Sequence, residues 1–236
     1  MIKKVLFFLS ILVTSFSIAQ NTAQEYYNSA LLNDSLKDYP AAVRDLDNAL
    51  QIKFTYDSAY YLLGSINSKL GDFKTAIKLL NKTIELSPNY FEAYFIRGIS
   101  KAQVGEYQQA IKDFNKALAI NPSSSKVYYN MALAKGYVED YSSAIKDLSK
   151  AIRIDKNYIN AYYSRAYLED ISGEYDAAVD DYKKVIELDP DYREAYLGMA
   201  TLMYQNGEKS KACEVLKIAA DKGSIMAEEL MNKLCN

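Results

Sequence analysis

The chain has 236 residues, a formal net charge of −2, and neither histidine nor tryptophan. Without histidine it lacks the commonest metal ligand and the usual general base near neutral pH. It also shows no glycine-rich phosphate loop, no nucleophile elbow, no CxxC pair and no basic stripe of the kind that nucleic-acid binders carry. We therefore expect no catalytic residue, no metal site, no cofactor and no nucleic-acid partner, and hence no enzyme.

Residues 1–19 are predicted to be a secretory signal peptide. Two lysines precede the apolar run Val5–Val13, and Ser17 and Ala19 stand at the −3 and −1 positions of a cleavage site before Gln20. The run is shorter than the roughly 20 residues that span a bilayer, and a lipoprotein would have cysteine in place of Gln20. We expect an exported protein, periplasmic or secreted, with no transmembrane segment after cleavage. A retained signal anchor is the alternative.

A 34-residue pattern recurs six times after this leader, in the segments 23–56, 57–90, 91–124, 125–158, 159–192 and 193–224. The fourth position is always tyrosine, and the eighth is always alanine or glycine. The twentieth position is always alanine, namely Ala42, Ala76, Ala110, Ala144, Ala178 and Ala212. A fixed period of this length indicates an array in which neighbouring repeats must stack to bury a core. We predict one repeat domain over residues 20–236.

The third copy shows how one repeat is expected to fold. Tyr94 and Gly98 lie on one helical face, and Ile111 and Phe114 mark a second helix. Between the two runs, Gly105 suits a helix end that needs a positive φ. Proline follows the second run and discourages a helical conformation at the residue before it. Each repeat is therefore predicted as helix, tight turn, helix and short turn.

Glycine inside a predicted helix needs a compensating contact, because it costs about 1 kcal/mol relative to alanine. Gly64 and Gly98 occupy the eighth position of two repeats. We expect the alanine at the twentieth position to approach them almost backbone to backbone. The tyrosines are expected to fill the wider gaps as core residues.

The pattern resembles the tetratricopeptide repeat (TPR) family. The resemblance rests on an aromatic residue, a small residue, a turn, alanines and proline at set offsets, as in Tyr94, Gly98, Gly105-Glu106-Tyr107, Ala110, Phe114, Ala117 and Pro122. It implies an all-α fold, a right-handed superhelical solenoid of helix-turn-helix repeats. It also implies a non-catalytic scaffold whose second, fifth, sixth, ninth, twelfth and thirteenth repeat positions line a concave groove.

These groove positions hold the candidate partner-binding residues, which are Tyr27, Tyr61, Phe95, Tyr129, Asn130, Tyr163 and Tyr167. An aromatic ring at the fifth position has two interpretations. It packs against the next repeat, or it belongs to an exposed patch for recognition, to which tyrosine is well suited. We expect a protein or peptide partner with apolar anchors. Binding of carbohydrate or cell-wall material in the same groove is the alternative.

Two rows of acidic residues recur along the repeats. Asp38, Asp72, Glu106, Asp140, Glu174 and Glu208 precede the second helices and are predicted to be N-caps, where a carboxylate accepts backbone N–H bonds. Asp45, Asp113, Asp147 and Asp181 are predicted to lie on a solvated, convex outer face. Neither row is expected to bind a metal ion.

The two ends of the array carry separate predictions. Residues 225–235 are expected to form a capping helix with one apolar and one polar face. Cys213 and Cys235 lie on the arms of the last hairpin, and export would place them in an oxidising compartment, so we predict a disulfide between them. Two buried free thiols are the alternative. Loss of the leader leaves the first helix, near Thr22, without a cap, so self-association is a further possibility.

Overall fold

The fold is that of a computed structural model, which describes residues 22–235. The predicted signal peptide lies outside the described residues. Within residues 22–235 every regular element is an α-helix and no strand occurs. The predicted all-α class is therefore confirmed.

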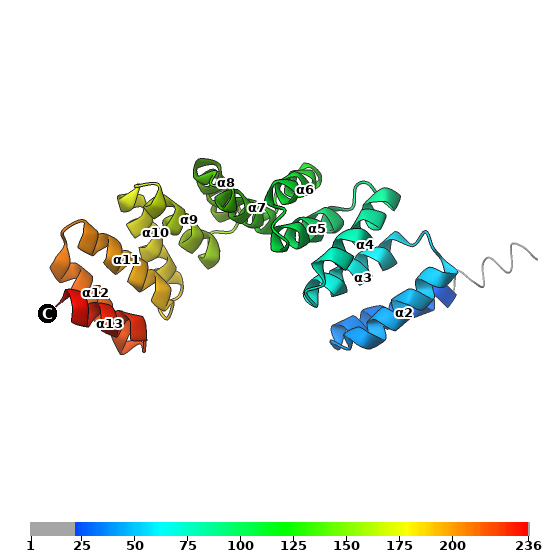
Figure 1. Cartoon of the computed structure of the whole chain (residues 1–236), viewed down its shortest axis with the longest axis horizontal. Coiled ribbons are helices and arrows are strands. Elements are labelled where there is room, and N and C mark those ends of the chain that lie inside the picture. The colour runs from blue at the N-terminus through cyan, green and yellow to red at the C-terminus, as the bar shows by residue number, and fades with distance from the viewer. Residues whose placement is uncertain (1–21, 236) are drawn as a thin grey trace, which may run out of the picture. The chain divides into compact units, whose positions relative to one another are not determined.

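The described residues divide into two compact units, the first ending at Asn121 and the second beginning at Pro122. The first unit contains a helix over residues 22–35, then α2 (Tyr39–Ile52), α3 (Asp57–Lys69), α4 (Phe73–Leu86), α5 (Phe91–Gln103) and α6 (Tyr107–Ile120). The second contains α7 (Ser125–Tyr137), α8 (Tyr141–Ile154), α9 (Ile159–Ile171), α10 (Tyr175–Leu188), α11 (Arg193–Gln205), α12 (Lys209–Asp221) and α13 (Ile225–Leu234). Within each unit, consecutive helices pack side by side as helix-turn-helix pairs (Figure 1).

The second helices all begin at the predicted acidic residue. Asp38, Asp72 and Asp140 accept a hydrogen bond from the backbone N–H three residues on, at 3.1–3.3 Å. Glu106, Glu174 and Glu208 occupy the same position without such a bond. The prediction of side-chain capping is thus right for the aspartates and wrong for the glutamates. The longer glutamate side chain does not close the short ring that aspartate forms with this N–H, and glutamate is not a preferred N-cap residue.

The mid-helix glycines do allow a close approach, but of a different side chain from the expected one. A Cβ placed on Gly98 would lie 2.6 Å from Cε1 of Phe114, and one on Gly64 would lie 2.9 Å from Cγ of Leu80. Phe114 and Leu80 lie four residues after the alanine at the twentieth repeat position, and both are fully buried. The eighth position is therefore small because it receives a bulky side chain from the second helix. The alanine at the twentieth position is buried as well, but it is not what the glycine accommodates.

The turn between the two helices of a repeat needs a positive φ at one residue. Gly105 takes this conformation, with φ of 83°. Repeats one and four have Lys37 and Glu139 there instead, both with φ of 62°. A side chain in the left-handed region costs about 1–2 kcal/mol, so these two turns are strained relative to the glycine turns.

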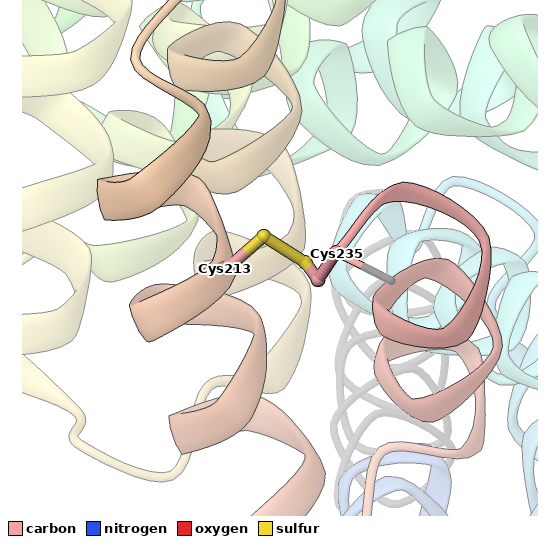
Figure 2. Close-up of a disulfide and its surroundings, with 2 residues drawn as sticks. All are labelled: Cys213 and Cys235. Atoms are coloured by element: carbon pink, nitrogen blue, oxygen red, sulfur yellow. A yellow bond between two sulfur atoms is a disulfide. The ribbon is translucent and has the colours of Figure 1, made fainter.

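The last hairpin is closed by the predicted disulfide. Cys213 on α12 and Cys235, directly after α13, are bonded, with their Cα atoms 5.8 Å apart (Figure 2). The side chain of Cys235 packs against a small core that contains Tyr196, Leu216 and Ala227. The bridge therefore ties the end of α13 to α12.

Both ends of the array carry a carboxylate where inner repeats bury an apolar group. The third repeat position is a fully buried alanine in Ala59, Ala93, Ala161 and Ala195, but it is the exposed Glu25 in the first helix. At the other end, the third residue of α13, Ala227, is buried like its equivalent in α11, Ala195. The fourth residue of α13 is the exposed Glu228, whereas its equivalent in α11 is the buried Tyr196. These charges hydrate the two end faces, as terminal repeats require.

The strained turn gives the first prediction. Glu139→Gly is expected to raise the free energy of unfolding of the second unit by about 1 kcal/mol, because it relieves the left-handed conformation. Gly105→Ala, at the equivalent turn, is expected to lower stability by a similar amount, since a Cβ there meets no atom within 4 Å and only the backbone effect remains. Urea denaturation followed by circular dichroism measures both. Shifts of the same sign in the two variants would contradict this account.

The disulfide gives the second prediction. Its loop spans 22 residues, for which the chain-entropy model expects a stabilisation of about 3 kcal/mol. Reduction, or Cys213→Ser with Cys235→Ser, should therefore increase amide hydrogen exchange in α12 and α13 far more than in α7 to α9. Equal protection of α13 with and without reductant would show that packing alone holds the cap. The thiol count of the unreduced, denatured protein serves as the control and should be zero.

Candidate partner-binding site

A recess that could receive a partner lies between α7 and α9 in the second unit. It has a volume of about 350 Å³ and is lined by four tyrosines, Tyr137, Tyr141, Tyr163 and Tyr167. Aliphatic side chains, including Leu133 and Ile171, complete the lining, and no charged residue belongs to it. This volume is at the lower end of ligand pockets, and it suits one large side chain of a partner. We call it the α7–α9 pocket.

The pocket exists because glycine leaves space at residue 136. A Cβ on Gly136 would meet only Cδ2 of Leu168, at an ordinary 3.7 Å. Gly98, in contrast, is required by the buried ring of Phe114. Gly136 therefore serves no close packing of helices, and its missing side chain opens the wall of the pocket.

The predicted ladder of aromatic residues at the fifth position consists of packed ring pairs. Tyr27 lies 5.0 Å from Tyr56 and Tyr61 lies 4.9 Å from Tyr90, measured between ring centroids. In the second unit Tyr129 lies 5.0 Å from Tyr158, and Tyr163 lies 5.1 Å from Tyr192 and 5.8 Å from Tyr182. Phe95 packs between Phe91 and Phe114. Each fifth-position ring is half-buried in these pairs, so packing is one of its roles.

The structure brings only part of the predicted site together. Tyr163 and Tyr167 share the α7–α9 pocket, and Tyr167 is 54% exposed. Asn130 is half-buried, and its amide donates a hydrogen bond to the carbonyl of Lys126, one turn earlier in its own helix. Tyr129 is in the same unit but does not line the pocket, and Tyr27, Tyr61 and Phe95 belong to the first unit.

The predicted partner-binding residues include only Tyr163 and Tyr167 of this lining. They miss, among others, Tyr141, Gly136, Leu168 and Ile171. Gly136 and Ile171 occupy the twelfth and thirteenth repeat positions, which the family resemblance already assigned to the groove. The signal was therefore present in the numbering. The repeat numbering gave no reason, however, to select a glycine and an isoleucine in preference to the tyrosines at other groove positions.

Burial raises the pKa of several tyrosine hydroxyls in the ring pairs, so that these hydroxyls stay protonated at physiological pH. Burial, followed by the neighbouring Tyr61, raises the pKa of Tyr90 to about 12, and burial beside Tyr129 raises the pKa of Tyr158 to about 12. Burial also raises the pKa of Tyr163, to which Glu194 and Tyr167 contribute. These hydroxyls can both donate and accept hydrogen bonds to a bound segment.

Three of the four aspartates predicted on the solvated outer face are buried instead, and Asp45 is half-buried, so this prediction is wrong. Asp113, Asp147 and Asp181 are only 3%, 2% and 6% exposed, and each faces the first helix of its own repeat. Arg97 binds Asp113 through two hydrogen bonds of 2.8 and 2.6 Å, and Arg165 binds Asp181 in the same way at 2.6 and 2.8 Å.

Asp147 and Asp45, the other two aspartates of this row, have lysine, serine and asparagine partners in place of arginine. Lys135 pairs with Asp147 at 2.5 Å, while Asp45 accepts hydrogen bonds from Ser29 and Asn33 at 2.7 and 2.9 Å. The partners lie 12 or 16 residues earlier in the chain, on another helix, where a pattern read along one helix does not reveal them.

Glu169 is the exception in this buried network. Repeat three has Lys101 at the eleventh position, 2.8 Å from Asp113, whereas repeat five has Glu169 there, facing Asp181. Glu169 is 6% exposed, and its Oε2 has no hydrogen-bond partner. Burial and the charge of Asp181, opposed by Arg165 3.6 Å away, raise its pKa to about 7. A raised carboxyl pKa is a common mark of an active site, but this carboxyl is enclosed between helices and does not line the α7–α9 pocket.

Residues 22–235 contain no group of three or more acidic, cysteine or histidine side chains arranged to hold a metal ion. No helix among the same residues combines the length and the apolar character that crossing a membrane requires.

Family models identify the repeats. Models described as tetratricopeptide repeat match residues 57–90, 91–124 and 125–158, and one described as TPR repeat matches residues 171–207. Together these matches cover more than half of the chain. No curated protein matched significantly.

Solved structures give the same result. MamA is 27% identical, with a TM-score of 0.67 over 70% of this chain and 97% of its own. YrrB, described as a TPR protein with an unusual peptide-binding site, is 21% identical, with a TM-score of 0.70 over 80% of this chain and 98% of its own. PilF of Pseudomonas aeruginosa is 17% identical, with a TM-score of 0.74 over 91% of this chain and 99% of its own.

These observations define an α-helical repeat protein. The chain belongs to the tetratricopeptide repeat family. Membership of this family supports a role in protein–protein interaction.

The raised pKa of Glu169 gives the third prediction. The folded state holds the proton more tightly than the unfolded chain, whose glutamate titrates near 4.5. Stability is therefore lost as the pH rises from about 4.5 through 7. Glu169→Gln stays neutral throughout, so it should match the parent at pH 4.5 and exceed it by on the order of 2–3 kcal/mol at pH 8.

Thermal or urea unfolding between pH 4.5 and 8 measures this difference. Glu169→Lys, which recreates the arrangement of Arg97, Lys101 and Asp113, should stabilise at pH 8 as well. Glu187→Gln, on the exposed face of α10, is the control, and its difference in unfolding free energy from the parent should not change with pH. A pH-independent effect of Glu169→Gln would refute the proposed ionisation.

Proposed function

We propose that the chain is a non-catalytic scaffold of the cell envelope or exterior that binds a segment of a partner protein on its concave, aromatic-lined surface. The observation that carries this proposal is the α7–α9 pocket, in which four tyrosines and aliphatic side chains surround an uncharged recess. Large, rigid side chains such as tyrosine supply contact area at a low entropic cost. An apolar anchor of the partner, inserted between Tyr163 and Tyr167, would fill the recess.

The comparisons support a peptide-like ligand in general terms. YrrB has the same fold and is described as having a peptide-binding site. At 21% identity this likeness concerns the fold alone, so the residues that would bind here come from the α7–α9 pocket itself. Its lining offers apolar walls with hydroxyl groups, which suits a mixed surface of side chain and backbone better than a charged ligand.

The location outside the cytoplasm rests on two observations. The first 19 residues have the charged start, apolar run and small cleavage-site residues of a signal peptide. The Cys213–Cys235 disulfide supports the same location, because structural disulfides persist mainly in oxidising compartments.

A carbohydrate ligand in the same groove is the second candidate. Tyrosine rings stack on sugars as well as on peptides, and the protonated hydroxyls of Tyr158 and Tyr163 can bond to either. The experiment below therefore includes a glycan arm.

The fourth prediction uses residues that are exposed enough to change without unfolding the protein. Tyr61, Tyr129 and Tyr163 are unsuitable, because their rings pack against Tyr90, Tyr158 and Tyr192. Tyr167 and Ile171 are 54% and 47% exposed and line the pocket. The double variant Tyr167→Ser, Ile171→Ser should weaken partner binding at least tenfold, as loss of an interface anchor does.

The bait for this experiment is the chain from Gln20 to Asn236, used to capture partners from a detergent-solubilised envelope extract and to probe a glycan array. Phe54→Ser is the matched control, since Phe54 is 73% exposed but lies in the first unit, outside the pocket. The partner is expected to bind the parent and the control and to be lost from the double variant. A partner that all three proteins retain, or binding to glycans without protein capture, would overturn the proposal.

A further inference from the structure

A lysine ammonium group is held by an acid and a tyrosine ring between the first two repeats. Lys69 of repeat two lies 2.8 and 3.0 Å from the two carboxylate oxygens of Asp34. Its ammonium nitrogen is also 5.9 Å from the centroid of the Tyr39 ring, within the range of a cation–π contact. These three residues occupy the twelfth and seventeenth positions of one repeat and the thirteenth position of the next.

The same positions of repeats five and six hold Asp170, Tyr175 and Gln205. The acid and the tyrosine are kept, but glutamine stands where repeat two has lysine. A recess of about 270 Å³, lined by Tyr175, Leu202, Gln205 and Asn206, opens at this place. These four residues occupy the same repeat positions as Tyr39, Ile66, Lys69 and Leu70. The recess therefore lies at the position that the side chain of Lys69 fills between repeats one and two.

Both retained groups are left without the contact that Lys69 supplies. Tyr175 is 50% exposed, whereas Tyr39 is half-buried. No lysine or arginine among the described residues forms an ion pair with Asp170, and partial burial alone raises its pKa. The two lysines on the adjoining surface, Lys183 and Lys211, pair with Asp180 and Glu208.

The other repeat pairs within the units do not have this combination. Between repeats two and three the equivalent residues are Ser68, Phe73 and Gln103, and between repeats four and five they are Gly136, Tyr141 and Ile171. Neither set contains an acid, and the second forms part of the α7–α9 pocket. Among these pairs, only repeats five and six therefore have an acid and a tyrosine at these positions without the lysine.

We propose that this recess binds the ammonium group of a lysine side chain supplied by the partner. Asp170 would pair with the ammonium group, and the ring of Tyr175 would cover its methylene stem and face its charge. This assignment rests on the proposed function and deepens it, because it gives the partner a lysine next to its apolar anchor. Lysine is preferred over arginine because the site within this chain that has the same acid and ring is filled by a lysine.

The fifth prediction tests the site with a defined probe, the peptide acetyl-Gly-Gly-Lys-Gly-Gly-amide, and with its counterpart in which the lysine is acetylated. The full chain is titrated with each peptide, and the backbone amide resonances are followed by NMR. The lysine peptide is expected to shift the resonances of Asp170, Tyr175 and Gln205. The acetylated peptide should bind at least threefold more weakly, because it has lost the charge.

Three variants make the test specific. Asp170→Asn should weaken binding of the lysine peptide about threefold to tenfold, and Gln205→Lys should do the same by filling the recess from within. Gln205→Lys should also lower the pKa of the Asp170 carboxyl in the absence of peptide. Gln103→Lys, at the thirteenth position of repeat three, where no acid faces it, is the matched control and should change neither quantity.

Equal shifts with both peptides, or undiminished binding to Gln205→Lys, would overturn this inference. Its failure differs from failure of the proposed function. If capture of the partner still depends on Tyr167 and Ile171 while the lysine peptide does not bind, the ammonium site is refuted and the proposed function stands.

Discussion

The spacing within each helix pair depends on a fully buried alanine at the twentieth repeat position. All six of these alanines, from Ala42 to Ala212, have no exposed surface. Because the paired helices come this close, a bulky side chain at the twenty-fourth position has room only where the facing eighth position is small, as Phe114 against Gly98 shows. The surface of the first helices that remains after this packing is what the protein can use for recognition. A larger residue at the twentieth position would move that surface along with the core.

Charged groups inside the helix pairs specify which helices pair and in which register. Arg97 bonds to Asp113 of its own repeat and to Asn81 of the preceding one, and Arg165 bonds in the same way to Asp181 and Ser149. Each arginine thus joins three successive helices. A buried ion pair adds little net stability, since desolvation offsets the attraction, but a displaced partner is costly. The network therefore selects one alignment of the helices, and Glu169 is a position where this selection is incomplete.

Most of the fold could be predicted from the sequence, because its signals are local and repeated. The period places the helices, Gly105 and its equivalents mark the turns, and two cysteines in one hairpin have few choices of partner. The buried aspartates could not be predicted in this way. Asp113 and Asp147 follow lysines in the sequence and look like members of an exposed charged face, but their partners are 12 to 16 residues away on another helix. The α7–α9 pocket was only partly predictable, because it depends on volume that Gly136 leaves unfilled, and an absent side chain gives no positive signal.

Departures from the repeat pattern are more informative about function than the pattern itself. Positions that agree in all repeats, such as the buried alanine, are explained by packing alone. Where repeats share a framework but differ in one member, each repeat serves as a reference for the others. Lys69 shows what satisfies an acid and a ring at this junction, so Asp170 and Tyr175 without a lysine identify a place completed from outside. Lys101 likewise shows what a buried aspartate prefers, so Glu169 identifies an internal defect. The two cases differ in access: Tyr175 borders an open recess, whereas Glu169 is enclosed by helices, and only the first can therefore be completed by a partner.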